Sequence, residues 1–188
     1  KVRRLEQAEH GLTRPLYEEV FSEDSKRFID YYYTEKTKDN QIYVAEEDGG
    51  IQAMLHLNPY ELNVNGTKKK ANYIVAVATR ESYRGRGFMK ALLETALKDM
   101  YREGESFTYL MPADENYYLP FDFRFGMTQI EQEVEYLPDL YIPEEREAEK
   151  YTFKAEISEA ELEKITTQEN AVKDTVFDIY TDISPDYI

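Results

Sequence analysis

Residues 73–111 constrain the fold of this chain more than any other stretch of its sequence. Residues 73–79 are apolar on both faces, as in a central strand that helices cover on each side. After a glycine-containing loop, apolar side chains recur at helical spacing: Phe88, Met89, Leu92, Leu93, Ala96, Leu97, Met100 and Tyr101. Gly104 can end this helix in a left-handed conformation, and residues 107–111 are a further apolar strand candidate. We therefore expect a β-loop-α-β unit with two parallel strands.

The region before this unit predicts both helices and strands. Residues 1–5 are a short strand candidate. Between residues 12 and 33 apolar side chains recur at helix-like intervals, with a break near residues 22–25. We therefore expect a short strand followed by two helices.

Two apolar runs, residues 41–45 and 51–57, flank a turn that contains Gly49-Gly50. Glycine permits the positive φ of a tight turn, so these runs predict a β-hairpin. Asn65-Gly66 marks a second turn before the strand at residues 73–79.

Beyond residue 111 the hydrophobic pattern changes. Residues 128–137 and 151–157 are strand candidates, separated by a charged connection that contains prolines. Ser158 and Glu161 have the spacing of a capping box, which predicts a helix over residues 159–179.

The composition excludes several classes of protein. The chain has 38 acidic and 23 basic side chains and a net charge of -15, so we expect neither nucleic acid nor a membrane surface as a partner. The absence of cysteine excludes disulfides, thiolate zinc sites and cysteine nucleophiles, and two histidines cannot make a three-histidine metal site, so we expect no metal. No apolar run approaches the roughly 20 residues of a membrane span, and a cytoplasmic setting is the simplest expectation.

The loop Arg84-Gly85-Arg86-Gly87-Phe88-Met89 joins the apolar strand to the periodic helix. The first helical turn has amide hydrogens without intrahelical partners and a positive dipole end, and glycines let a phosphate approach the main chain. The two arginines add positive charge in an acidic chain. These residues indicate a pyrophosphate site. The alternative interpretation is a plain strand-to-helix turn with solvated arginines, which would show the same residue pattern. Neither a Walker loop nor the G-x-G-x-x-G dinucleotide fingerprint occurs.

The same loop resembles motif A of the acetyl-CoA-dependent N-acetyltransferases of the GNAT superfamily, [Q/R]-x-x-G-x-[G/A], at every position but the last, where Met89 stands. Residues 77–83 look like the usual approach to that motif. Residues 118–123 resemble the superfamily's tyrosine-then-aromatic segment after strand five. Within the superfamily the chain is most similar to the enhanced-intracellular-survival type, which joins a GNAT domain to a second, degenerate GNAT domain and a sterol-carrier-like domain. Large aliphatic residues end the motif in that type too.

The resemblance implies an α/β GNAT fold, with a mixed central sheet flanked by helices, and acetyl-CoA as cosubstrate. It implies a GNAT acetyl-CoA-binding domain over residues 1–140. Residues 141–188 would be a connection and the start of a second GNAT-like domain, which could be truncated.

The resemblance also implies roles for individual residues. Main-chain groups of Val77, Ala78 and Thr79 would pair with the pantetheine arm of acetyl-CoA, and Ala113 and Asp114 would line the same cleft. Tyr118 would be the catalytic general acid that protonates the departing thiolate. The pyrophosphate would be held by Arg84, Gly85, Arg86, Gly87, Phe88, Met89 and Lys90.

We therefore expect an N-acetyltransferase that moves an acetyl group directly to a primary amine. The acidic surface favours a polyamine, an aminoglycoside-like compound or a lysine as the acceptor, because negative charge concentrates cations. A strand amide near Val77 would hold the oxyanion. Glu46, Glu47 and Asp114 are candidate general bases, with solvated charges as the alternative interpretation. The alternative function is a non-catalytic domain that binds CoA or only a protein partner, and a homo-oligomer is compatible with the sequence.

Overall fold

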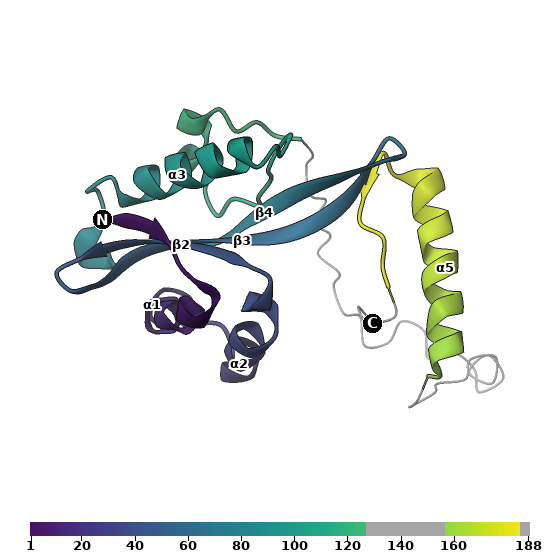
Figure 1. Ribbon diagram of the computed structural model, residues 1–188, viewed down its shortest axis with the longest axis horizontal. Helices are drawn as coiled ribbons and strands as arrows, with labels where there is room; N and C mark the ends of the chain where they lie inside the picture. The colour runs from purple at the N-terminus through teal and green to yellow at the C-terminus, as the bar shows by residue number, and fades with distance from the viewer. Residues whose placement is uncertain (127–156, 185–188) are drawn as a thin grey trace, which may run out of the picture. The chain divides into compact units, whose positions relative to one another are not determined.

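The computed structural model describes residues 1–126 and 157–184 (Figure 1). The chain divides into two compact units. The first contains residues 1–111 and 172–182, and the second contains residues 112–171 and 183–188. No helix in the described part of the chain is long and apolar enough to cross a bilayer.

An antiparallel sheet forms the centre of the first unit. Its strand order is β1 (Val2–Arg4), β2 (Gln41–Glu47), β3 (Gly50–Val64) and β4 (Thr67–Thr79). Both predicted turns are confirmed, since β2 and β3 form one hairpin and β3 and β4 form a longer one. Asn65 and Gly66 connect β3 to β4 with φ angles of 48° and 73°, which is the positive-φ pair that a tight two-residue hairpin turn requires.

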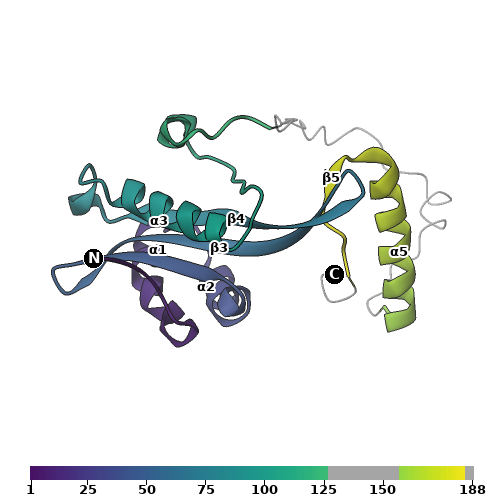
Figure 2. The ribbon, with the colours of Figure 1, turned by 45° about the horizontal axis from the view of Figure 1, so that its top comes forward.

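Helices cover both faces of this sheet, as expected for a strand that is apolar on both sides. Figures 1 and 2 show α3 (Phe88–Arg102) on one face and α1 (Arg14–Val20) and α2 (Lys26–Thr34) on the opposite face. The predicted break between the first two helices is confirmed, because α2 starts afresh at Ser25, whose hydroxyl accepts a hydrogen bond from the amide of Phe28 at 3.2 Å. Gly104 follows α3 with a φ of 83°, the left-handed stop that the sequence predicts.

Each face of the sheet has its own buried core. On the α3 side, the apolar stripe of the helix supplies Leu92, Leu93, Ala96 and Met100, all buried. On the α1 and α2 side, the core consists of Leu5, Leu16, Tyr17, Ile29, Tyr32, Ile42, Val44, Met54, Ala76 and Ala78. Full burial of a large aliphatic side chain stabilises the fold by roughly 2 kcal/mol. The two cores therefore fix β3 and β4 between the helices.

The strand expected at residues 107–111 is reduced to one bridge, in which Tyr109 pairs with Tyr73 of β4. The amide of Ile74 donates to the Tyr109 carbonyl at 2.9 Å. The bridge is parallel, so the predicted direction is confirmed, whereas the predicted length is wrong. A bulge in β4 just beyond Ile74 interrupts the edge that a longer strand would need.

The C-terminal helix α5 (Glu159–Val176) begins with the predicted capping box, in which the amide of Glu161 donates to the Ser158 hydroxyl at 3.4 Å and the Ser158 amide donates to the Glu161 carboxylate at 3.1 Å. The expectation that this helix continues to residue 179 is wrong. Ile179–Tyr180 instead form β5, which pairs antiparallel with Asn63 and Val64 of β3. The strand candidates at 128–137 and 151–157 lie outside the described residues, except for residue 157.

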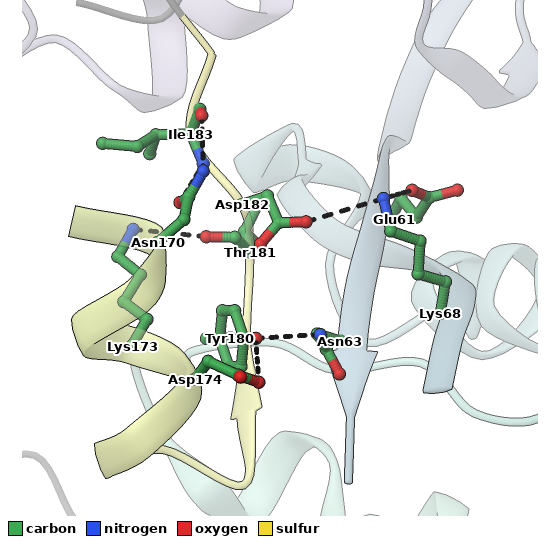
Figure 3. A network of polar contacts seen from close by, with 10 residues as sticks. All are labelled: Glu61, Asn63, Lys68, Asn170, Lys173, Asp174, Tyr180, Thr181, Asp182 and Ile183. Atoms are coloured by element: carbon green, nitrogen blue, oxygen red, sulfur yellow. Dashed lines mark hydrogen bonds and ion pairs between the residues drawn. The ribbon is translucent and has the colours of Figure 1, made fainter. Parts of the chain in front are cut away.

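Polar side chains fasten β5 to the far end of the β3–β4 hairpin (Figure 3). The Asn63 amide group donates to the Tyr180 hydroxyl at 2.8 Å, and that hydroxyl donates to Asp174 at 3.0 Å. Lys68 lies 3.5 Å from the Asp182 carboxylate. The segment after α5 therefore extends the sheet of the first unit.

Candidate functional site

β4 carries a bulge shortly before the glycine loop. Met54 pairs with Ala78 and His56 pairs with Val75, so Ala76 and Val77 together lie opposite one residue of β3. Ala76 is buried and has a φ of 50°, a left-handed conformation that costs a residue other than glycine about 1 kcal/mol or more. A bulge turns main-chain groups out of the regular ladder. The main chain of Val77 is therefore displaced from the regular strand geometry directly before Thr79 and the loop.

The start of the loop is anchored on β3. The amide of Arg80 donates to the Gln52 carbonyl at 2.8 Å, and its Nε donates to the Gln52 side chain at 3.1 Å. The Arg80 guanidinium also forms an ion pair with Glu19 of α1. These contacts fix the point at which the chain leaves the sheet.

The loop itself exposes main chain at the first turn of α3. Gly85 and Gly87 have φ angles of 73° and 82°, and apart from the glycine and its chain neighbours no heavy atom lies within 4 Å of the position that a Cβ would occupy at either residue. The first helical hydrogen bond runs from the Ala91 amide to the Gly87 carbonyl at 3.0 Å. The amides of residues 88–90 therefore have no carbonyl of the helix to bind, and they lie at its positive end. The loop fits a phosphate group that approaches the main chain.

Arg86 is held by several neighbours. Its Nη2 lies 2.5 Å from Glu47 Oε2 at the end of β2. Its guanidinium lies 5.0 Å from the ring centroid of Tyr83 and 5.5 Å from that of Phe88, within the range of cation–π attraction. The Tyr83 hydroxyl in turn donates to Asp48 at 2.8 Å. Arg86, which the sequence predicts to bind the pyrophosphate, is thus paired with the carboxylate of Glu47.

Two further cations flank the glycines. Arg84 is exposed, and its Nε donates to the Thr79 carbonyl at 3.2 Å. Lys90 is exposed, with its Nζ 3.8 Å from Glu94. Exposed contacts of this kind contribute little free energy, so both side chains can turn toward an anion. Met89, the departure from the motif, is half-buried on α3.

The three candidate general bases all have partners. Glu46 accepts a hydrogen bond from Arg3 at 2.9 Å, and this bond lowers the pKa of its carboxyl. Glu47 is paired with the loop arginine. Asp114 accepts from the Asn116 amide at 2.9 Å and caps a short 3-10 helix, η4 (Glu115–Tyr117). A lowered pKa makes the Glu46 carboxylate a weaker base. The roles of Glu47 and Asp114 as general bases remain predictions.

The predicted general acid belongs to the second unit. Tyr118 lies between η4 and a second 3-10 helix, η5 (Leu119–Phe121), and is half-buried. Its ring meets that of Phe123 at a centroid distance of 5.7 Å and an interplanar angle of 70°. Ala113 and Asp114 are exposed in the same unit. The roles of these three residues beside the loop remain predictions.

His56 lies on β3 beside the bulge and is completely buried. Its Nδ1 is 2.9 Å from the Tyr32 hydroxyl of α2, and the two rings are stacked. Burial lowers the pKa of the imidazole to about 3, so the ring is neutral at pH 7. His56 is therefore a packed residue of the sheet.

Comparisons with known proteins agree with this architecture. A family model described as an acetyltransferase (GNAT) domain matches residues 1–126. No curated protein matches the sequence.

Solved structures with similar folds share little sequence identity with this chain. A probable N-acyltransferase from Enterococcus faecalis has a TM-score of 0.60 at 20% identity over 64% of this chain and 31% of its own. A predicted acetyltransferase with acetyl-CoA from Clostridium acetobutylicum has a TM-score of 0.59 at 16% identity over 75% of this chain and 99% of its own. An aminoglycoside acetyltransferase from an uncultured soil metagenomic sample has a TM-score of 0.53 at 17% identity over 72% and 98%. At such identities these structures show the fold alone, and this chain spans about a third of the Enterococcus protein.

The expectation of a GNAT fold is thereby confirmed, with a sheet that is mostly antiparallel and flanked by helices. The matched residues include the whole β1–β4 sheet, the glycine loop and α3. The chain therefore belongs to the GNAT acetyltransferase family.

Proposed function

We propose that this chain binds acetyl-CoA and transfers its acetyl group to a primary amine. The observation that carries the proposal is the loop at the start of α3, where Gly85 and Gly87 adopt left-handed φ angles with open space at both Cβ positions. The diphosphate of CoA carries the negative charge that helix amides and the helix dipole stabilise. Arg84 and Lys90 add positive charge beside it. Phe88 and Met89 contribute first-turn amides, and Arg86 contributes its charge when it leaves Glu47.

Acetyl-CoA supplies an acetyl group that is activated as a thioester. The main chain of Val77, Ala78 and Thr79 would pair with its pantetheine arm, with Ala113 and Asp114 lining the same cleft. An amide near Val77 would donate to the carbonyl oxygen as that oxygen gains charge, and one such donor contributes roughly 10² to 10³ in rate. The bulge at Ala76 and Val77 supports this role, because it turns main-chain groups out of the ladder.

Tyr118 would donate its phenolic proton to the sulfur that leaves. General acids of this kind contribute about 10² to 10⁴ in rate. An aliphatic amine with a pKa of about 10.4 is mostly protonated at neutral pH, so it must lose a proton before it attacks. The absence of cysteine from the sequence agrees with direct transfer, without a cysteine thioester on the enzyme.

The acceptor class follows from charge. A net charge of -15 concentrates cations near the protein, which supports a polyamine, an aminoglycoside-like compound or a lysine as the acceptor. One protein of similar fold is an aminoglycoside acetyltransferase. Both observations support a basic amine rather than an acidic substrate.

The narrower assignments are proposals as well. The enhanced-intracellular-survival type is the narrower assignment that the resemblance of the glycine loop and its Met89 implies. It would make residues 1–140 the acetyl-CoA-binding domain, and residues 141–188 a connection and the start of a second GNAT-like domain. A cytoplasmic setting and a homo-oligomer fit the same proposal.

Two measurements test the function. Calorimetry should show that CoA binds more tightly than ADP, because both carry a diphosphate but only CoA has a pantetheine arm for β4. Release of free thiol from acetyl-CoA, followed over a panel of amines, should identify the acceptor. CoA that binds no better than ADP, together with no thiol release for any amine, would overturn the proposal.

A further inference from the structure

Three tyrosines form a cluster on the face of the sheet that α2 covers. Alternate residues of a strand share a face, so Asn58 and Tyr60 of β3 lie on the same side as His56, which stacks on Tyr32 of α2. The ring centroid of Tyr109 lies 5.2 Å from that of Tyr73 and 6.4 Å from that of Tyr60. We call Tyr60, Tyr73 and Tyr109 the tyrosine cluster.

All three rings are half-buried, so each keeps some surface open to solvent. Burial, followed by the neighbouring tyrosines, raises the pKa of Tyr109 to about 12. That phenol therefore stays neutral at physiological pH. A neutral aromatic face attracts cations through its quadrupole.

One ammonium group of the chain already lies against the cluster. The Nζ of Lys36, in the 3-10 helix η2 (Lys36–Lys38) that follows α2, is 5.1 Å from the ring centroid of Tyr60. This distance is within the range of a cation–π contact. The Tyr60 ring of the cluster thus already contacts an alkylammonium group.

A buried acceptor without a hydrogen-bond donor lies beside the cluster on β3. Asn58 is 6% exposed, and within the described residues its buried Oδ1 has no hydrogen-bond partner. Asn58 lies directly opposite Tyr73 in the β3–β4 register and two residues before Tyr60. A buried carbonyl oxygen without a donor destabilises the fold, and an N–H group of a ligand would offset this cost. The aromatic rings and this oxygen both suit an ammonium ion.

We propose that the tyrosine cluster and Asn58 form a subsite for a second, non-reacting ammonium group of the acceptor, which takes the place of Lys36. This assignment rests on the proposed function, which puts the reacting amine near Val77. Tyr73 precedes Val77 by four residues on the same strand, and at about 3.3 Å per residue the two lie roughly 13 Å apart. The acceptor would therefore be an aliphatic polyammonium compound with amines separated by about that length, rather than a monoamine.

The test uses spermidine, with butylamine as its single-amine counterpart, and calorimetry on the full chain with and without CoA. We expect spermidine to bind more tightly than butylamine. Tyr60→Leu should weaken spermidine binding by about tenfold, whereas Tyr60→Phe, which keeps the ring, should bind nearly as well as the wild type. Asn58→Leu should also weaken spermidine binding, and it should fold, because it removes a buried oxygen that has no donor.

Lys36 offers a matched pair of variants. Lys36→Met should strengthen spermidine binding about threefold, because it frees the Tyr60 ring. Lys38→Met removes the same charge from the same short helix, but the Lys38 ammonium pairs with Glu35 at 2.6 Å and contacts no ring among the residues that the structure describes. Any effect of net charge is common to both variants, so the difference between them isolates the contact with the cluster. This pair decides the question even if Tyr60→Leu does not fold.

The subsite and the proposed function fail in different ways. Equal spermidine affinity in Lys36→Met and Lys38→Met, or in folded Tyr60→Leu and Tyr60→Phe, overturns the subsite even when acetyl transfer occurs. Absence of spermidine binding, or no preference over butylamine, also overturns it. Absence of CoA binding and thiol release overturns the proposed function. In that case a spermidine affinity that depends on Tyr60 and Lys36 would still support an ammonium-binding site at the tyrosine cluster.

Discussion

Arg86 and Glu47 form an ion pair whose Nη2 and Oε2 atoms lie 2.5 Å apart. The pair joins the glycine loop to the end of β2, and both side chains are partly exposed. An arginine that the motif assigns to pyrophosphate binding is therefore shared with a carboxylate of the same protein. A bound diphosphate would compete with Glu47 for this guanidinium.

Replacement of this carboxylate should strengthen CoA binding. In Glu47→Gln, Arg86 no longer has a charged partner, and because the pair is partly exposed we expect a gain of about threefold in affinity. Glu46→Gln is the control, since it removes the same charge from the neighbouring residue, whose partner is Arg3. Calorimetry with CoA measures both variants. Equal affinities in the two variants would show that Arg86 does not contact the diphosphate.

A carboxylate in the loop should have the opposite effect. Gly87→Glu places negative charge at the first turn of α3, and we expect CoA affinity to fall at least about tenfold, which is roughly 1.4 kcal/mol. Gly66→Glu is the control, because Gly66 has a similar left-handed φ of 73° and open space at its Cβ position, but lies at the β3–β4 turn. Both variants carry similar backbone strain. A CoA affinity that Gly87→Glu leaves unchanged would reject the assigned loop.

Tyr118→Phe separates an enzyme from a CoA-binding module. The substitution removes only the hydroxyl that would donate a proton, so turnover should fall by about 10² to 10⁴ while CoA affinity stays the same. Tyr117→Phe is the control, because Tyr117 is the adjacent tyrosine and is exposed. Thiol release and calorimetry on the same samples measure the two properties. Turnover that is equal in both variants would exclude Tyr118 as the general acid.

His56 should make the fold less stable in acid. Its pKa is lowered from 6.5 to about 3 by burial, so below pH 6.5 the unfolded chain binds a proton that the folded chain does not. The free energy of unfolding therefore falls as the pH decreases from 6.5 toward 3, and His56→Gln should show a shallower decrease over this range. Denaturant melts at several pH values measure it. Tyr32→Phe keeps the imidazole and should retain the wild-type slope, and a His56→Gln slope equal to the wild type would contradict the assignment.

Local sequence signals predict the elements whose causes are local. The Asn65-Gly66 turn, the break before α2, the capping box at Ser158 and the periodic stripe of α3 were all identifiable without tertiary information. The end of α5 was not, because Ile179 and Tyr180 leave the helix in order to pair with β3, which is distant in sequence. Tertiary pairing of this kind overrides a helical pattern.

Part of the candidate site is also predictable from local sequence, and part of it depends on tertiary structure. Gly85 and Gly87 in the sequence predict a loop before α3, and in the structure both adopt left-handed φ angles there. The bulge at Ala76 has no such signal, because alanine rarely adopts a positive φ and nothing in the sequence marks it. The pairing of Arg86 with Glu47 and the contact of Lys36 with Tyr60 depend on which strands lie side by side. Only a three-dimensional structure shows them.

The pairing of β5 with β3 also bears on self-association. β2 and β5 pair with the same edge of β3. The pairing with β2 reaches Leu57 and the pairing with β5 begins at Asn63, so among the described residues this edge is unpaired only over residues 58–62. Pro59 lies in that gap and has no N–H group to donate, and Glu61 adds a charge beside it. Both features discourage a strand of another molecule from pairing there. Loss of β5 would lengthen the unpaired edge as far as the hairpin turn, and the chain would then be more prone to form intermolecular sheets.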